Sequence, residues 1–380
     1  MRAVPSLGEV FDPRRNGLDA VRLALALGVV LWHSVSLLGV RLAWQPAERL
    51  LLSGLVDAFF AVSGFLIVRS WLRDEDPVRF LAARVLRIMP GFWVCLLVVA
   101  FVVSPLYLLL TGRGVGAAAL LDGASYVGHN ALLWIFQDGI AGGPTGGAPG
   151  DDGIWNGSLW TLSWEFACYL GVLGLGVAGL LRRRWVVPVL FVVAVGTLAL
   201  VLLPGFDHVP LLKHAARFAT MFLAGALLHQ VRHRVPAHGL LVLAALGLVV
   251  LGAVLVPADY RLVAALPLAY AVVVGGALLR HPAATLRHDL SYGTYVYAYP
   301  VQQLLVGTLP GLGPAGLLGL SLAGTLPLAA ASWWWVERPA HRLRHRWSSG
   351  RAVPASVDAG ADTTTRVKIG QTAPEVNVSH

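Results

Sequence analysis

Charged residues are scarce in this chain. Of its 380 residues only 13% are Asp, Glu, Lys or Arg, whereas 57% are hydrophobic, and the mean hydropathy is +0.69. A typical soluble domain has about 25% charged residues, so this composition excludes a domain dissolved in water. The polar residues gather between long apolar runs, and a helix needs roughly 20 apolar residues to cross a bilayer. Because backbone groups in lipid must be hydrogen-bonded within the segment, the sequence predicts an all-α polytopic integral membrane protein.

Cysteine is scarcer still. The two cysteines, Cys95 and Cys168, fall inside apolar runs, and no C-x-x-C spacing is present. This argues against a disulfide framework or a cysteine metal site, and we expect no metal. The net charge is +9, but the basic residues stand at the ends of apolar runs rather than in one patch, so we expect no nucleic-acid partner.

About ten transmembrane helices can be drawn along the apolar runs, at 18–38, 52–70, 90–111, 158–181, 185–203, 215–231, 238–256, 261–279, 290–309 and 315–336. Cytoplasmic loops of membrane proteins are enriched in Lys and Arg. With these spans, 20 of the 29 Lys and Arg residues fall on one side, six on the other and three in the C-terminal tail. This asymmetry predicts that both termini are cytoplasmic, and we expect a multi-pass protein of the plasma (inner) membrane.

Two further segments complete the organisation. Residues 115–136 are apolar but contain Asp122 and His129. If they crossed the membrane, every later loop would change side, so we expect them at the outer interface or in a re-entrant helix. Residues 348–380 are rich in Ser, Thr, Ala, Pro and Gly without apolar periodicity, which is typical of disorder. We therefore expect a transmembrane domain at 1–347 and a disordered cytoplasmic tail after it.

Three ionisable residues, His33, Asp57 and Glu165, lie well inside predicted spans. Such residues are costly in the membrane and usually functional. With a rise of about 1.5 Å per residue, each lies roughly 7–11 Å below the outer boundary, which predicts one polar pocket in the outer half. His33 would be the catalytic group, with Asp57 or Glu165 orienting its imidazole. The alternative is that each is a buried, hydrogen-bonded structural group.

Arginines at the cytoplasmic side form a second pattern. Arg22 precedes His33 by eleven residues, which puts both on one helical face about 16 Å apart. Arg84 and Arg87 are helical neighbours before the third span, and Pro90 is compatible with a break there. Guanidinium groups bind phosphates well, so these arginines are candidates for binding the phosphates of coenzyme A. The alternative is that they only reflect the positive-inside rule.

Six motifs in chain order resemble those of the membrane-bound acyltransferase-3 family. They are Arg22 with His33, GLVDAFFAVSGFLI at 54–67, RVLRIMPGFW at 84–93, SLWTLSWEFACYL at 158–170, LSYGTYVYAYPV at 290–301 and Glu337-Arg338-Pro339. Together they extend over residues 17–339, nearly the whole hydrophobic part of the chain. One position departs from the family pattern: many members have a His where this chain has Ala298. Whatever that His does elsewhere cannot be done here in the same way.

The resemblance implies O-acyl transfer, usually of acetyl, from cytoplasmic acyl-CoA to a hydroxyl of a carbohydrate, lipid or other small acceptor. His33 would be the catalytic histidine, either as general base or as acyl carrier, and no permanently bound cofactor is implied, since acyl-CoA is the donor substrate. The candidates for binding acyl-CoA are Arg22, Arg84, Arg87, Ser63 and Tyr292.

A proton-coupled transporter or flippase for a polar lipid or glycan is the main alternative, with His33, Asp57 and Glu165 as a proton relay. It explains the intramembrane charges equally well. It does not explain the cytoplasmic arginines, nor the absence of the inverted repeat that many transporters have. A polyprenyl-phosphate-sugar glycosyltransferase would need acidic residues in the first outer loop, where residues 39–51 contain only Glu48.

Overall fold

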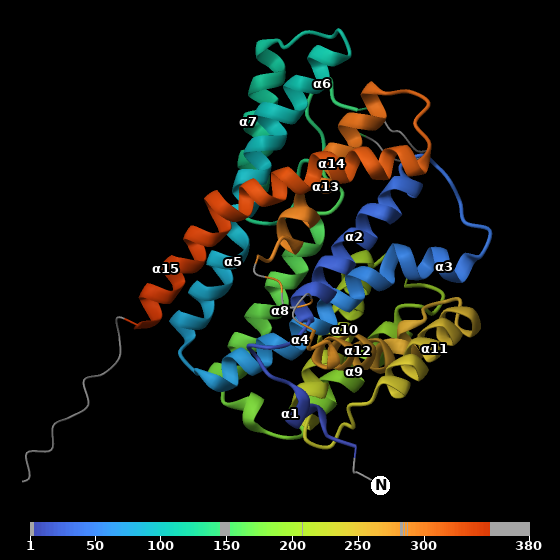
Figure 1. The fold of residues 1–380 in the computed structure, drawn as a ribbon. Coiled ribbons are helices and arrows are strands. Elements are labelled where there is room, and N and C mark those ends of the chain that lie inside the picture. The colour runs from blue at the N-terminus through green and yellow to red at the C-terminus, as the bar shows by residue number, and fades with distance from the viewer. Residues whose placement is uncertain are drawn as a thin grey trace, which may run out of the picture.

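The structure, a computed structural model, describes residues 4–144, 153–206, 208–281, 284, 286 and 288–349. In these residues we find helices and no strand beyond one isolated bridge between Ser6 and Pro236. The α-helices are α1 (Leu7–Val10), α2 (Leu18–Ser36), α3 (Gln45–Arg49), α4 (Leu55–Arg73), α5 (Pro77–Val98), α6 (Ser104–Leu110), α7 (Ala117–Asn130), α8 (Trp160–Val177), α9 (Val186–Leu200), α10 (Pro210–Val231), α11 (Gly239–Leu255), α12 (Arg261–Leu278), α13 (Ser291–Thr308), α14 (Pro314–Ser332) and α15 (Arg338–Ser349). Figure 1 shows how they pack together. The chain is an all-α polytopic membrane protein, as its composition predicts.

Six helical segments of the described chain are long and apolar enough to cross a membrane. They are Leu18–Ser36, Gln45–Arg73, Pro77–Leu110, Pro210–Val231, Arg261–Leu278 and Pro314–Leu343. Three of them are continued by π-helical segments: η1 (Leu50–Gly54) joins α3 to α4, η2 (Val99–Val103) joins α5 to α6, and η5 (Trp333–Glu337) joins α14 to α15. Each π segment adds one residue to a turn and so rotates the side chains that follow it.

Each of the ten predicted spans coincides with a helix, although four of these helices are shorter or more polar than the six above. The helices α9 and α11 are apolar but short. The polar helix α13 is buried on all sides from Ser291 to Gln303, so it packs against protein rather than lipid. The predicted third span began at Pro90, whereas α5 begins at Pro77 and continues through Pro90. Membrane helices tolerate an internal proline when neighbouring groups satisfy the freed carbonyl.

The helices α4 and α10 cross with their backbones in contact. A Cβ at Gly64 would lie 1.9 Å from the carbonyl oxygen of Phe222, and a Cβ at Gly225 would lie 1.8 Å from the carbonyl oxygen of Ala61. Small residues allow membrane helices to approach this closely. The Ser-Gly-Phe motif therefore contains a packing glycine, and the crossing fixes the position of Asp57 on α4.

Residues 115–136 contain a single helix, α7, which packs against α5, α6 and η2 and lies at the top of Figure 1. The buried Asn130 side chain accepts from the backbone N–H of Phe136 at 2.9 Å and donates to the carbonyl of Gln137 at 2.7 Å. This fixes the turn that follows the helix. The neighbouring side chains of Leu121, Leu132 and Phe136 are exposed, and the position of this helix at the outer interface stays a prediction.

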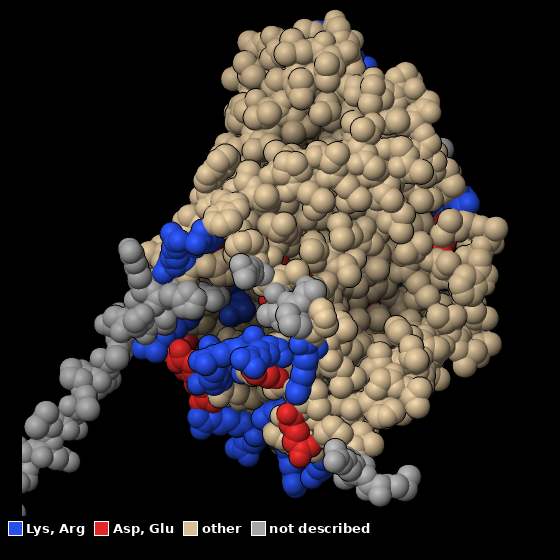
Figure 2. Space-filling model, in the orientation of Figure 1, with Lys and Arg blue, Asp and Glu red and all other residues tan. Residues whose placement is uncertain are grey.

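Charged side chains gather mainly in one part of the face drawn in Figure 2, and a smaller charged group lies at its right edge. Most of that face carries no charge, and Lys and Arg gather at its lower left, near α1, the α4–α5 turn and α15. This distribution matches an apolar belt with one basic end. The predicted disordered tail at 348–380 lies, from residue 350 onward, outside the described residues, as do residues 145–152.

Candidate active site

Asp289 binds two arginines, Arg22 near the beginning of α2 and Arg87 in the middle of α5. Its Oδ2 accepts from Nη1 of Arg22 at 2.9 Å and from Nη2 of Arg87 at 2.5 Å. All three side chains are mostly buried, with exposed fractions of 21% for Arg22, 14% for Arg87 and 13% for Asp289. Burial alone would raise the pKa of Asp289, but the two guanidinium groups outweigh it and hold this pKa well below its usual range.

The sequence analysis did not single out Asp289. What could have marked it is its position two residues before Ser291, where α13 begins. The Asp289 carboxylate accepts from the backbone N–H and the hydroxyl of Ser291, and short acidic residues are favoured at helix N-termini. One carboxylate therefore caps α13 and pairs with Arg22 and Arg87. Arg22 also lies 4.0 Å from the half-exposed carboxylate of Asp19, a weaker contact that a phosphate could replace.

Arg84 does not join this cluster, although it lies one turn from Arg87. Its Nη2 donates to Ser70 Oγ at 3.2 Å, and its guanidinium lies 5.8 Å from the ring centre of Tyr169. Arg87 instead lies 5.9 Å from the ring centre of Tyr292 and contacts Asp289. Side chains three residues apart on a helix point in directions that differ by about 60°, so Arg84 and Arg87 contact different neighbours of α5.

Glu165 lies in a small cluster between α4 and α8. Its Oε1 accepts from Ser63 Oγ at 2.8 Å and from the hydroxyl of Tyr169. Glu165 also lines a narrow cavity of about 40 Å³ together with Arg22 and Tyr292. The candidates Arg22, Ser63, Glu165 and Tyr292 thus meet in or beside one inner cavity.

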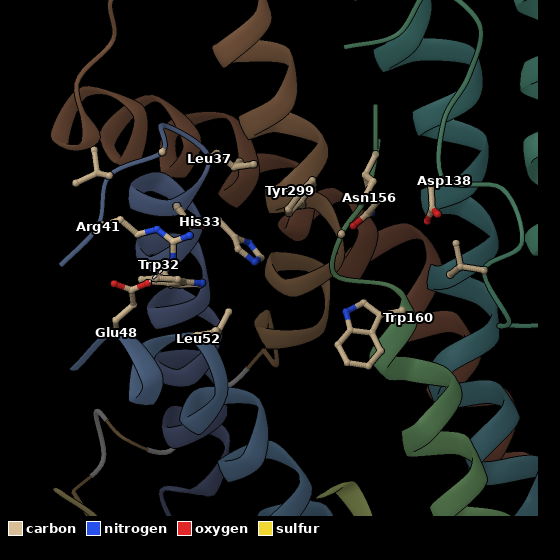
Figure 3. Close-up of a pocket in the computed structure, with 16 residues that line it drawn as sticks. Trp32, His33, Leu37, Arg41, Glu48, Leu52, Asp138, Asn156, Trp160 and Tyr299 are labelled. Carbon is tan, nitrogen blue, oxygen red and sulfur yellow. Dashed lines mark hydrogen bonds and ion pairs between the residues drawn. The ribbon is translucent and has the colours of Figure 1, made fainter. Parts of the chain in front are cut away.

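His33 opens into a different and larger cavity of about 540 Å³. Its ring packs edge-on against Tyr299, with ring centres 4.9 Å apart, and its buried Nδ1 has no hydrogen-bond partner among the described residues. Figure 3 shows the His33 ring projecting from α2 toward the side of the cavity where Tyr299, Asn156 and Trp160 lie. Aromatic and polar side chains are mixed in the wall, as in many sites for polar organic ligands.

Asp57 is held away from His33 by another set of partners. It is fully buried and accepts from Arg217 Nε at 3.2 Å, from Arg261 Nε at 2.6 Å and from the hydroxyl of Tyr260. The expected pairing of His33 with Asp57 or Glu165 is therefore absent from the described residues. Depth along a helix can be estimated from the sequence, but the direction in which each side chain points depends on how the helices are rotated against one another.

The two cavities meet at consecutive residues of α8. Trp160 lines the His33 cavity, and Thr161 lines the inner cavity. Between them the hydroxyls of Thr161 and Tyr295 are 2.5 Å apart, and Tyr295 also donates to the carbonyl of Ser158. The arrangement can hold a negatively charged ligand at Arg22 and a neutral polar ligand beside His33, with a short polar partition between them. No group of His, Cys, Asp or Glu among the described residues could hold a metal ion.

Comparisons with known proteins identify the kind of enzyme to which this geometry belongs. The sequence model of an acyltransferase domain, that of the acyltransferase-3 family, matches residues 15–334. The chain is 28% identical over 344 residues to an O-acetyl transferase of Shigella phage Sf6, covering 86% of this chain and 96% of the relative. It is 30% identical over 361 residues to Nodulation protein 10 of Rhizobium leguminosarum bv. viciae, covering 87% and 94%.

A third relative is the Exopolysaccharide production protein ExoZ of Rhizobium meliloti (strain 1021), which is 26% identical over 304 residues, covering 75% of this chain and 88% of the relative. No solved structure matches the chain significantly. The family match includes the helices that carry Arg22, His33, Glu165 and Tyr292. The chain belongs to the acyltransferase-3 family and is a membrane-embedded O-acyltransferase.

Proposed function

We propose that the protein transfers an acetyl group from cytoplasmic acetyl-CoA to a hydroxyl of a glycan or glycolipid at the plasma (inner) membrane. The observation that carries this proposal is that the two ends of α2 line two different cavities. Arg22 lines the inner cavity near one end of the helix, and His33 lines the large cavity near the other. Eleven residues of helix separate them by about 16 Å, a distance suited to an extended thioester arm.

The donor phosphates would bind at Arg22 and Arg87. Asp289 holds both guanidinium groups in place, and the second carboxylate, Asp19, lies 4.0 Å from Arg22 with a side chain that is 54% exposed. A phosphate arriving there would gain charge-assisted hydrogen bonds without having to order two flexible side chains. The thioester would then follow the cavity lined by Glu165 and Tyr292 toward the partition at Thr161.

His33 would act as general base in the transfer. Its imidazole would take the proton from the acceptor hydroxyl, whose oxygen attacks the thioester carbonyl. The C–S bond breaks, the coenzyme A thiolate leaves and takes up the proton, and an ester is formed. The opening of the ring into a cavity of about 540 Å³ supports this role, because a hydroxyl in that cavity can reach the ring.

A glycan acceptor is supported by two observations. The relatives include an exopolysaccharide production protein, and the wall of the His33 cavity contains Trp160 and Tyr299 next to Asn156 and Asp138. Aromatic faces beside hydrogen-bonding groups are well suited to sugar rings. The size of the cavity is in the range that accommodates one small organic ligand.

The test uses purified protein in proteoliposomes with labelled acetyl-CoA and a soluble oligosaccharide acceptor. His33→Ala should reduce ester formation by about 10²- to 10⁴-fold, the usual contribution of a general base. His129→Ala on the exposed face of α7 is the matched control and should retain activity. Full activity of folded His33→Ala would refute the mechanism. A transporter or flippase would leave no label on any acceptor.

A further inference from the structure

A second cavity, of about 270 Å³, lies beside the His33 cavity, and Leu52 lines both. It is formed where η1 meets the first turns of α10 and α12. Its wall is unusually basic, and its Lys and Arg residues are Arg49, Lys213, Arg217 and Arg261. The only acidic residue in its wall is Asp259, and no function described above uses this cavity.

The charges of this cavity do not cancel. Arg217 and Arg261 both donate to the buried Asp57, and Arg261 also donates to Asp259 at 2.8 and 2.9 Å. Arg49 donates to the carbonyl of Ala253, which carries no charge. Among the described residues neither Arg49 nor Lys213 forms an ion pair. Two carboxylates thus face four basic groups, and two positive charges remain.

Arg261 supplies a separate indication of a ligand. Its side chain is only 7% exposed, and its Nη2 is buried without a hydrogen-bond partner among the described residues. A buried donor left without an acceptor destabilises a protein, so such a group marks a place where an acceptor belongs. Arg261 lines the cavity, so its guanidinium group adds to the positive charge there, and a small movement of the side chain would bring Nη2 to a ligand oxygen. The guanidinium fork is well matched to phosphate oxygens.

We propose that this cavity binds the phosphate or diphosphate of a lipid-linked acceptor and thereby places the attached sugar beside His33. The inference rests on the proposed function, since it assigns the acceptor of that same site. Leu52 is the shared wall, so a ligand whose charged group sits among Arg49, Lys213 and Arg261 can extend directly into the His33 cavity. The position at the ends of membrane helices also suits the headgroup of a lipid.

The binding test needs no catalysis, so its outcome is independent of the proposed function. Binding of a short-chain polyprenyl diphosphate to purified protein in detergent is measured at several salt concentrations, with Arg49→Gln and Lys213→Gln as variants. These residues contact no buried carboxylate, so both variants should fold. Each should weaken binding about tenfold, the effect of one charge-assisted hydrogen bond, and should reduce the salt dependence. Arg113→Gln, at a basic residue on another loop, is the control and should bind as the wild type does.

Competing ligands distinguish the possible sources of the phosphate. Inorganic pyrophosphate should compete weakly, and vesicles of phosphatidylglycerol should not compete, if the site recognises an acceptor lipid. Equal affinity of wild type and both variants for the polyprenyl diphosphate would overturn the proposal, as would equally strong competition by phosphatidylglycerol. In the transfer assay the Lys213→Gln variant should raise KM for a phosphate-bearing acceptor but not for a neutral oligosaccharide. If His33→Ala keeps its activity while the binding results hold, the mechanism fails and the phosphate site stands.

Discussion

Replacement of Asp289 by Asn tests the cluster that joins α2 to α5. The amide has nearly the same shape as the carboxylate but no charge, so Arg87 would lose its counter-ion and Arg22 would keep only the more distant, half-exposed Asp19. Removing one partner of a fully buried ion pair costs about 3–5 kcal/mol. The three side chains here keep between 13% and 21% of their exposure, so we expect a smaller loss of about 2 kcal/mol, equivalent to roughly 30-fold in the unfolding equilibrium.

The assay is the free energy of unfolding in detergent, obtained by denaturant titration with and without coenzyme A. Coenzyme A should stabilise Asp289→Asn more than the wild type, because its phosphates would supply the missing negative charge at Arg22 and Arg87. Glu75→Gln, which breaks an exposed pair with Arg182, is the control and should change nothing measurable. A variant as stable as the wild type, or one stabilised equally by coenzyme A, would refute the assignment.

The pH dependence of stability provides a second readout of Asp289. Its pKa in the folded protein is lowered by Arg22 and Arg87 against the opposing effect of burial. The stabilisation is therefore fully present above the unfolded value of about 3.9 and is lost as the pH falls below it. We expect the contribution of this group to be full and independent of pH between pH 5 and 8, and we expect the wild type to lose stability in acid in a way that Asp289→Asn does not.

Two further predictions concern the packing and the donor side. Gly64→Ala should destabilise the protein by about 3 kcal/mol or more, because its Cβ would lie 1.9 Å from a backbone carbonyl oxygen. The control Gly171→Ala, whose Cβ would meet nothing within 4 Å, should not destabilise it. Equal unfolding free energies of the two variants would contradict the backbone contact at Gly64. Arg87→Ala should weaken acyl-CoA binding about tenfold with a smaller salt dependence. Arg182→Ala, at an exposed side chain, should not, and an unchanged dissociation constant for Arg87→Ala would leave Arg87 as a topology signal only.

The architecture was predictable because apolar runs and basic loops report directly on membrane crossing. The residue range of α2 and the proximity of Arg22 to one end and His33 to the other follow from helix geometry alone. What the sequence could not supply was the rotation of one helix against another. Counting residues placed Asp57, Glu165 and His33 at similar depths and predicted one shared pocket. The prediction is wrong: Asp57 contacts arginines of α10 and α12, and Glu165 contacts Ser63 and lines the cavity of Arg22, whereas His33 lines another cavity.

Residues at the ends of the predicted spans were harder to interpret from the sequence. Asp289 precedes α13 by two residues and looked like an ordinary loop residue, and only the structure brings Arg22 and Arg87 to it. Arg261 counted as one basic residue on the sparsely charged side of the membrane. Its buried position beside Asp57 required contacts between residues 204 positions apart, which no local pattern contains.

The all-round burial of α13 has a consequence for how the protein is made. Its sequence of Ser, Tyr, Thr and Gln between Ser291 and Gln303 would partition poorly into lipid without neighbours. Stable insertion of α13 therefore depends on its neighbours, of which α14 and α2 contact it most. A chain that ends before α14 would leave this polar helix without the partner that follows it in the sequence.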